Sequence, residues 1–289
     1  MDNTLQYHYM VRKLRHFFQE KKGFIEVPAQ SRVSILAACE QPKTITQYTL
    51  GGQIYPMPQT GQMWLEYELL KHPEWLGVFC ITTSYRDEQN PIEGRHQRIF
   101  PMFEFESHGT FEDLKQLEEE LLTYLGFQMP ISIDYSFAAK RYETQILEAV
   151  HESALEKEFS CVISLEHFPE YTNPFWNMKR SESGLYNKID VLLHGIETIG
   201  SAERETNIDL MKERFFTIEQ GEYANLLFNK FGSERVIAEL KAYLALPMIP
   251  RFGGGIGLTR LARAMALSGL FDQSGMIYKT EPQAAQLSL

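Results

Sequence analysis

Apolar residues recur with helical spacing in several parts of the chain. Over residues 5–22 they fall near every third or fourth position with basic residues between them, a pattern typical of an amphipathic helix. Gly23, which follows directly, favours a helix end. The same spacing predicts further helices over 62–72, 113–125, 140–158, 208–245 and 257–267.

Apolar runs bounded by proline, glycine or polar residues predict strands between these helices. A strand over 77–85, a polar loop over 86–97 and a second strand over 98–106 together predict a long antiparallel hairpin. A shorter hairpin is expected around Gly51 and Gly52. The remaining predicted strands cover 24–28, 160–164, 174–179, 187–200 and 250–256.

Strands outnumber βαβ units in this order of elements. We therefore expect an α+β fold, in which helices flank an antiparallel β-sheet, and not a doubly wound parallel sheet. The length of 289 residues and the apolar content of 44% are compatible with a single domain over 1–289 that has a substantial core. No internal repeat, low-complexity segment or Gly/Ser-rich linker divides the chain.

Charge and cysteine content narrow the class of protein. The net charge of −10 argues against a broad basic surface for nucleic acid. Cys39, Cys80 and Cys161 stand far apart and form no CxxC pair, which favours reduced, mostly buried thiols. The N-terminus lacks the pattern of a signal peptide, and no apolar run approaches the ~20 residues that span a bilayer. We expect a cytoplasmic protein without a membrane segment.

An arginine stands at the entry of the predicted long hairpin. Arg86 follows its first apolar run, and the donors of a guanidinium group match phosphate oxygens. In the same hairpin, Glu88 could accept from an adenine amine, Arg95 and His96 could reach an outer phosphate, and Phe100 could stack on a base. Ordinary salt bridges on a surface hairpin explain these residues about as well.

Two acidic residues later in the chain form a candidate metal site. Asp190 and Glu197 lie seven positions apart, so on one continuous strand their side chains would point to opposite faces. A bend or bulge at Gly195 would bring both carboxylates to one side, where they and nucleotide phosphates would suit Mg²⁺. Two solvated acids at a strand edge are the simpler alternative.

A glycine run precedes the last predicted helix. The sequence FGGGIGLTR over 252–260 contains Gly255 and ends at Arg260, and glycine lets the backbone approach a nucleotide closely. No Lys-Ser/Thr follows, so the run is not a Walker loop, and a tight turn would explain it more simply.

Two polar residues share one face of the helix predicted over 62–72. Gln62 and Glu66 are separated by one helical turn and could together bind a small polar substrate. A solvated helix face is the alternative explanation of this pair.

In this order and at these spacings, the segments resemble the catalytic domain of the class II aminoacyl-tRNA synthetases, in the asparaginyl/aspartyl/lysyl subgroup. Within it, the chain is most similar to asparaginyl-tRNA synthetase and to stand-alone asparagine synthetase-like proteins. The helix and strand up to Pro28 resemble motif 1, residues 78–96 resemble motif 2 and residues 253–260 resemble motif 3. The resemblance covers nearly the whole chain and includes 61–66 and 173–179.

The resemblance implies a site for ATP. Arg86 would hold the α-phosphate and the substrate carboxylate, Glu88 would meet the adenine amine and Phe100 would stack on adenine. Arg260 would pair with the γ-phosphate and cover the other face of adenine. The remaining residues of this ATP site would be Arg95, His96, Glu197 and Gly255.

The resemblance also implies a metal site and an amino-acid site. Asp190 and Glu197 would bind Mg²⁺. Gln62 would contact the amino acid, Arg204 would bind the oxygen of its side chain, and Glu66 would lie near a side-chain amide or amino group.

The chain departs from the family pattern at several places. Ile99 replaces the glutamate that precedes the stacking aromatic residue, and Leu65 replaces a lysine in the pocket of aspartate-specific enzymes. No anticodon-binding domain is expected, because the motif 1 helix begins almost at residue 1 and such a barrel needs on the order of a hundred residues. Glu104, Glu106 and the glycine run resemble asparagine synthetase A.

These features predict an ATP-dependent ligase that forms an adenylate. The carboxylate of aspartate or asparagine would attack the α-phosphorus of ATP, with Arg86, Arg260 and Mg²⁺ stabilising the charge that develops. The leading hypothesis is that ammonia then attacks β-aspartyl-adenylate to give asparagine. A second is transfer of asparaginyl or aspartyl to another amine, a protein or tRNA, and a third is a non-catalytic regulatory paralogue. A homodimer is expected from the motif 1 resemblance, and tRNA is not expected as a partner.

Overall fold

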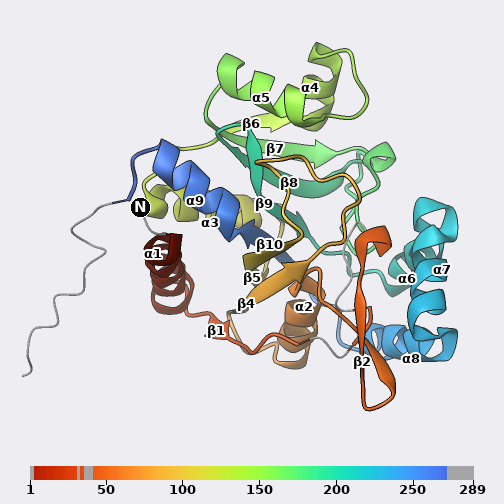
Figure 1. Ribbon diagram of the computed structural model, residues 1–289. Helices are drawn as coiled ribbons and strands as arrows, with labels where there is room; N and C mark the ends of the chain where they lie inside the picture. The colour runs from red at the N-terminus through yellow and green to blue at the C-terminus, as the bar shows by residue number, and fades with distance from the viewer. Residues whose placement is uncertain (1–2, 31–32, 36–41, 272–289) are drawn as a thin grey trace, which may run out of the picture.

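A mixed β-sheet of eight strands forms the centre of the structure, a computed structural model that describes residues 3–30, 33–35 and 42–271 (Figure 1). Cys39 lies outside the described residues. Most neighbouring strands are antiparallel, whereas β1–β4 and β6–β7 are parallel. The expected α+β class is confirmed, with a mixed sheet. In spatial order the strands are β1 (Ile25–Glu26), β4 (Gly77–Tyr85), β5 (Ile99–His108), β10 (Arg251–Gly257), β9 (Ile196–Glu203), β8 (Tyr186–Leu193), β7 (Val162–Phe168) and β6 (Ile131–Asp134).

The predicted long hairpin is formed by β4 and β5. The two strands pair along their whole length, from Gly77 opposite Ser107 to Tyr85 opposite Ile99. β10 is antiparallel to the other side of β5. Because β4 and β10 both run antiparallel to β5, their C-terminal ends lie at the same end of the sheet. The segments that follow β4 and β10, which carry Arg86 and Arg260, therefore begin at the same end of the sheet.

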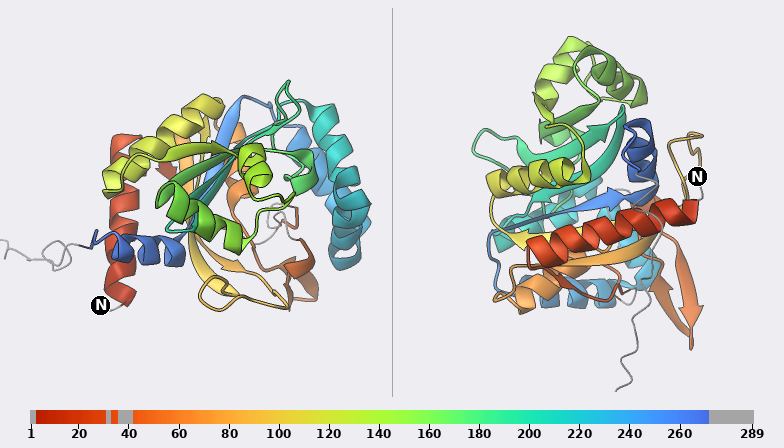
Figure 2. Two further views of the ribbon diagram at one scale, coloured as in Figure 1. Left: turned by 90° about the horizontal axis from the view of Figure 1, so that it is seen from above. Right: turned by 90° about the vertical axis from the view of Figure 1, so that its left-hand side faces the viewer.

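Three helices cover one face of the sheet: α1 (Asn3–Arg15), α3 (Phe111–Leu125) and α9 (Leu258–Leu267). Figure 2 shows them on the side opposite to the helices formed by residues 208–244. α1 continues through a wider turn to Lys21, and the ring of Phe18 packs within 5.0 Å of the rings of Phe103 and Phe105. α3 begins with a capping box between Thr110 and Asp113, which satisfies backbone donors at its first turn. This face is thus closed by an apolar core.

A second group of helices packs around Trp176 on the other side: α2 (Gln62–Lys71), α6 (Ile208–Thr217), α7 (Glu222–Phe231) and α8 (Ser233–Leu244). The single helix expected over 208–245 is wrong. Glu219 and Gln220 adopt positive φ values of 49° and 57° between α6 and α7, and Gly232, with a φ of 87°, separates α7 from α8. These breaks fold the helices against one another.

The helix expected over 140–158 is also wrong. The structure has α4 (Tyr135–Arg141) and α5 (Ala149–Glu158), which form a lobe with its own apolar cluster beside β6 and β7 (Figure 1). β6 was not predicted. The break between α4 and α5 is held by the Tyr135 hydroxyl, which accepts from the Leu147 amide at 2.9 Å. Tyr135 and Leu147 lie 12 residues apart, so the spacing of apolar residues does not indicate the break.

Two further strand predictions need correction. Residues 174–179 do not form a strand; Met178 makes only an isolated bridge to Arg204. Residues 187–200 form two strands, β8 and β9, joined by a tight turn at His194 and Gly195. The short hairpin at Gly51 and Gly52 is confirmed and joins β2 (Gln47–Leu50) to β3 (Gln53–Pro56).

Within the described residues no helix is long and apolar enough to cross a bilayer. Cys80 is buried and Cys161 is partly buried, and both are free thiols.

Candidate active site

The hairpin of β8 and β9 carries both candidate metal-binding carboxylates. Asp190 lies opposite Gly200 across the two strands. Val191 pairs with Ile199, but the next residue along β8 pairs with Glu197, so Thr198 is an extra residue in β9. Such a bulge reverses the side-chain alternation and turns Glu197 to the face of Asp190.

The two carboxylates point to one place as a result. Glu197 Oε1 and Asp190 Oδ1 lie 3.0 and 3.6 Å from the position that a Cβ on Gly200 would occupy. The predicted bend or bulge is therefore present, but at a different residue. Gly195 lies in the hairpin turn, and the bulge is at Thr198.

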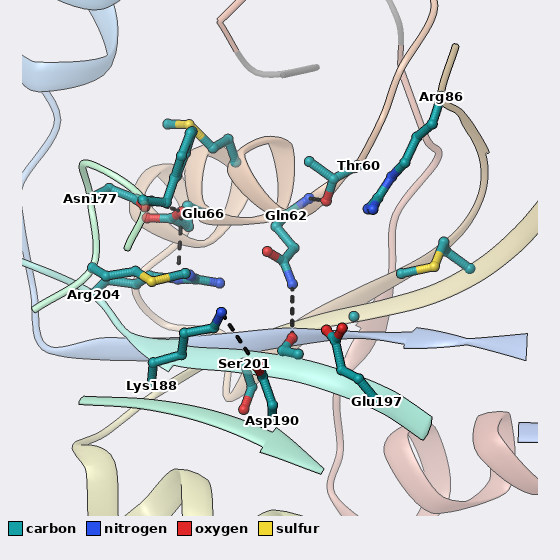
Figure 3. Close-up of a pocket in the computed structure, with 16 residues that line it drawn as sticks. Thr60, Gln62, Glu66, Arg86, Asn177, Lys188, Asp190, Glu197, Ser201 and Arg204 are labelled. Atoms are coloured by element: carbon teal, nitrogen blue, oxygen red, sulfur yellow. Dashed lines mark hydrogen bonds and ion pairs between the residues drawn. The ribbon is translucent and has the colours of Figure 1, made fainter. Parts of the chain in front are cut away.

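A cavity of about 190 Å³ lies over these strands, between β8, β9, β10, α2 and the segment that precedes β8. Figure 3 shows Glu66, Asn177 and Arg204 at one end of it and Arg86 and Glu197 at the other. The candidates that line it are Gln62, Glu66, Arg86, Asp190, Glu197, Arg204 and Gly255.

A second cavity of about 210 Å³ adjoins the first. Arg86, Glu197 and Gly255 line both, so the two cavities meet at these residues. Arg86 and Arg260, which are far apart in the chain, face this common space. The candidates that line the second cavity are Arg86, Glu88, Arg95, His96, Phe100, Glu197, Gly255 and Arg260.

Charged side chains that line the second cavity are held in place by hydrogen bonds and ion pairs with one another. The Arg260 Nη1 donates to the backbone oxygen of Glu197 at 2.7 Å and lies 3.6 Å from its carboxylate. His96 Nδ1 lies 2.9 Å from a carboxylate oxygen of Glu88. The Arg86 guanidinium lies over the Phe100 ring, 5.4 Å from its centroid. Cationic and aromatic groups of this kind suit phosphates and a planar base.

The charge on Glu197 suits a metal ligand. Burial alone would raise the pKa of Glu197, but the neighbouring cations Arg260, Lys188 and Arg86 overcome this and leave it below the ordinary value. In the described part of the chain no three His, Cys, Asp or Glu side chains cluster as a complete metal site. Two carboxylates fit Mg²⁺, which keeps several positions for water and phosphate oxygens.

Glu66 lines the first cavity, but its carboxylate is bonded to buried side chains of the protein. Its carboxylate is fully buried and accepts from Arg251 Nη2 at 2.7 Å, the Tyr243 hydroxyl at 2.7 Å and Asn177 Nδ2 at 2.5 Å. Within the protein, the amide that Glu66 contacts is that of Asn177, and a contact with an amide or amino group of the amino acid stays a prediction. Arg204 is anchored in a similar way, with Nε and Nη2 donating to Glu106 at 3.1 and 3.0 Å.

Another buried carboxylate fixes the beginning of α2. Glu104 accepts from the backbone amide of Gly61 at 2.8 Å and from the hydroxyls of Thr60 and Thr82. An anionic acceptor at a helix N-terminus is favourable. Glu104 therefore holds the helix turn that places Gln62 in the cavity.

The glycine run is part of β10, not a turn. A Cβ on Gly253 would overlap the buried carboxylate of Glu106, and one on Gly255 would lie 2.8 Å from Met102 Cε and 3.3 Å from Gln62 Nε2. The glycines thus make room for the acids beneath the cavity and for the residues that line it. The tight-turn alternative is wrong.

Sequence reasoning missed Lys188 and Asn177, which both line the first cavity. The Lys188 ammonium lies 3.4 Å from Asp190 Oδ2. Strand alternation contained the signal for it, since residues two apart face the same side. Leu65 does not line either cavity but is fully buried in a core cluster with Cys80 and its neighbours. The presence of Leu65 in place of a lysine therefore does not determine the charge of either cavity.

Fold and site together define a class II synthetase type of domain, and the sequence agrees. Residues 1–269 match the family described as tRNA synthetases class II (D, K and N), and the chain belongs to this family. No curated protein matches the chain.

Solved structures share the fold. Asparaginyl-tRNA synthetase from Pyrococcus horikoshii, complexed with asparaginyl-adenylate, aligns with a TM-score of 0.74 and 18% identity over 90% of this chain and 64% of that one. The Entamoeba histolytica asparaginyl-tRNA synthetase complex with the same adenylate gives 0.73 and 19% over 91% and 63%. A putative aspartyl-tRNA synthetase from Leishmania major Friedlin gives 0.69 and 14% over 93% and 64%. The chain spans less than two-thirds of the length of each.

Proposed function

We propose that the chain is an ATP-dependent, AMP-forming ligase that activates an amino acid of the aspartate or asparagine type as an acyl-adenylate. The observation that carries this proposal is the convergence of Arg86, Arg260 and Glu197 on two adjoining cavities. One cavity has the cations and aromatic ring that suit a nucleotide, and the other has polar groups that suit an amino acid. Asparaginyl-adenylate, which two of the similar structures hold, has one half for each cavity.

Arg86 lies where the two cavities meet, so its guanidinium would hold the α-phosphate beside the amino-acid carboxylate. The carboxylate oxygen would bond to the α-phosphorus while the bond to pyrophosphate breaks. Positioning and charge stabilisation suffice for this step, so no side-chain nucleophile is required. Asp190 and Glu197 would hold Mg²⁺, which neutralises phosphate charge when bound.

The first cavity offers one donor and one acceptor at the end away from Arg86. Arg204 uses Nε and Nη2 for Glu106, which leaves Nη1 for the cavity toward which its guanidinium points in Figure 3. Asn177 Nδ2 donates to Glu66, and its buried Oδ1 has no hydrogen-bond partner among the described residues. An unpaired buried acceptor is unfavourable and is often completed by a ligand.

A carboxamide would satisfy both groups, because its oxygen accepts from Arg204 and its NH₂ donates to Asn177. A carboxylate would place a second acceptor against Asn177 Oδ1. Rotating the Asn177 amide would not help, since its oxygen would then face the Glu66 carboxylate. We therefore favour asparagine as the activated amino acid.

Pyrophosphate exchange into ATP, measured with each of the twenty amino acids, tests this function. Exchange that depends on asparagine is expected. If no amino acid supports exchange while ATP still binds, the chain is the regulatory paralogue and the ligase proposal is wrong.

A second candidate is aspartate activation followed by attack of ammonia to give asparagine. Lys188 favours it, because its ammonium group lines the amino-acid cavity and would attract a second carboxylate. Incubation with ATP, aspartate and ammonium would then yield asparagine and AMP. Absence of both products would reject this candidate and leave asparagine transfer to another amine, a protein or tRNA.

We also propose that 1–289 forms one catalytic domain that pairs with a second copy through α1 and β1. Apolar side chains are exposed there, with Leu5 at 44% and Ile25 at 38%. Light scattering coupled to size exclusion would give the mass of a dimer, and a monomer mass at micromolar concentration would contradict this pairing.

A further inference from the structure

Arg95 ties the loop between β4 and β5 to the lobe formed by α4 and α5. Most side chains of this loop are exposed. Arg95 instead points inward: its Nη2 pairs with Glu152 of α5, and its Nη1 donates to the backbone oxygen of Gly195 at 3.1 Å. The side chains of Arg95 and Glu152 are only 17% and 18% exposed. The lobe thus meets the second cavity, here called the nucleotide cavity, at this ion pair.

Glu152 lies among the charges of the nucleotide cavity without lining it. Burial raises the pKa of Glu152, the carboxylate of Glu197 raises it further, and the guanidinium groups of Arg95 and Arg260 oppose this. Arg260 also donates to the backbone oxygen of Arg95 at 3.4 Å. Arg95 does line the cavity, and the ion pair with Arg95 is the direct contact between Glu152 and a residue of that cavity.

A long side chain on an exposed loop loses rotamer freedom when it binds a phosphate, which weakens binding. A partner that orders the side chain beforehand removes this loss. We propose that Glu152 is a positioning residue that holds Arg95 at the nucleotide cavity, so that its guanidinium meets the outer phosphates of ATP already ordered. The inference rests on the proposed function only in taking ATP as the ligand. It assigns the lobe of α4 and α5 a part in nucleotide binding.

Calorimetry with MgATP and with AMP tests the inference on the whole chain. AMP lacks the outer phosphates, so it reports on the adenosine part of the cavity alone. Glu152→Gln is expected to weaken MgATP binding about 3–10-fold, the loss that ordering one long side chain causes, and to leave AMP binding within about twofold. Glu158→Gln is the matched control, because Glu158 is on the same helix and pairs with Arg141 away from both cavities.

A double-mutant cycle separates positioning from a merely structural role. In an Arg95→Ala background, Glu152→Gln should change the MgATP affinity by less than about twofold, because the group through which it acts is gone. If Glu152→Gln fails to fold, Glu152→Asp keeps the charge, withdraws the carboxylate by one methylene and is expected to give a smaller but measurable loss of MgATP affinity. Thermal denaturation of each variant checks that folding is intact.

Three results would overturn the inference: unchanged MgATP affinity in the Glu152 variants, equal losses for AMP and MgATP, or a loss that persists without Arg95. The proposed function fails separately, when the wild-type chain binds MgATP but catalyses no exchange. If the wild-type chain binds no MgATP, both are wrong.

Discussion

At the scale of single residues, the carboxylate of Glu197 holds a central place because it lines both cavities and is surrounded by three cations. Glu197→Gln removes the charge that Mg²⁺ and Arg260 would share. We expect the rate of pyrophosphate exchange to fall about 100-fold, with a higher magnesium requirement. Glu213→Gln, an exposed acid on α6, should leave exchange unchanged. A Glu197→Gln variant with normal exchange would show that the metal is held elsewhere.

A different acidic residue controls stability. Glu118 of α3 is buried, and burial raises its pKa to about 8 although the neighbouring Ser201 side chain acts in the opposite direction. An exposed glutamate titrates near ~4.3, so between these values the folded chain keeps a proton that the unfolded chain has lost. The contribution of Glu118 to the free energy of unfolding is therefore complete at low pH and is lost as pH rises, by about 1.4 kcal/mol per unit.

Glu118→Gln removes this titration. We expect the variant to melt at a higher temperature than the wild type at about pH 7.5 and by a smaller margin at about pH 5. Thermal denaturation at both values measures it. Equal margins would mean that Glu118 is ionised in the folded chain.

Sequence reasoning located side chains well when their place depended on nearby residues. The spacing of Asp190 and Glu197 predicts opposite faces of a strand unless a bend or bulge intervenes, and the structure has such a bulge, at Thr198 and not at Gly195. The role of Glu66 could not be inferred in this way, because its partners Arg251 and Tyr243 follow it by more than 170 residues. Lys188 escaped notice although its signal, alternation with Asp190 along β8, is local.

At the scale of elements, β10 depends on residues without side chains. Gly253→Ala would place a methyl group on the Glu106 carboxylate and against the backbone of β5, both of which are fully buried. We expect a loss of more than about 3 kcal/mol in the free energy of unfolding. Gly257→Ala in the same strand is the control, since its Cβ would approach nothing closer than 3.7 Å. Denaturant unfolding measures both, and similar losses would contradict this account.

Elements were predictable where a break in the sequence pattern coincides with a break in the structure. Residues 77–85 match β4 because a continuous apolar run ends in polar residues at Arg86. The break between α4 and α5 contains no glycine or proline, so the helical spacing gave no sign of it. Gly195 indicates a bend within the β-like pattern over 187–200, but the pattern does not indicate that the bend is a complete turn between two strands.

At the scale of the whole molecule, the two cavities are lined by residues that lie between Thr60 and Arg260 in the chain. A bound nucleotide would therefore stabilise the fold as a unit. MgATP at about a hundred times its dissociation constant should add about 2.7 kcal/mol and raise the melting temperature by roughly 4–5 °C. ATP with a chelator in place of magnesium should raise it less. A melting temperature that does not respond to MgATP would contradict the convergence of these residues on a nucleotide.

The strand order explains how much of the site could be foreseen. Spacing alone indicates that Arg86 follows a strand and that Arg260 lies where a strand gives way to a helix, but not that β10 inserts between β5 and β9. Only that insertion brings the two ends together. The resemblance to the family supplied this long-range relation, and the structure confirms the fold on which it depends.

The buried network behind Asn177 bears on how the first cavity could be redesigned for another ligand. Glu66 accepts from the Asn177 amide and is itself held by Arg251 and Tyr243, and these three residues are buried. Exchanging Asn177 by itself would leave Glu66 paired with Arg251 and Tyr243, so any new side chain at this position would still lie against a fixed negative charge. In the proposed ligase, a change of amino-acid preference would therefore involve this buried acid and arginine as well as the residue that touches the substrate.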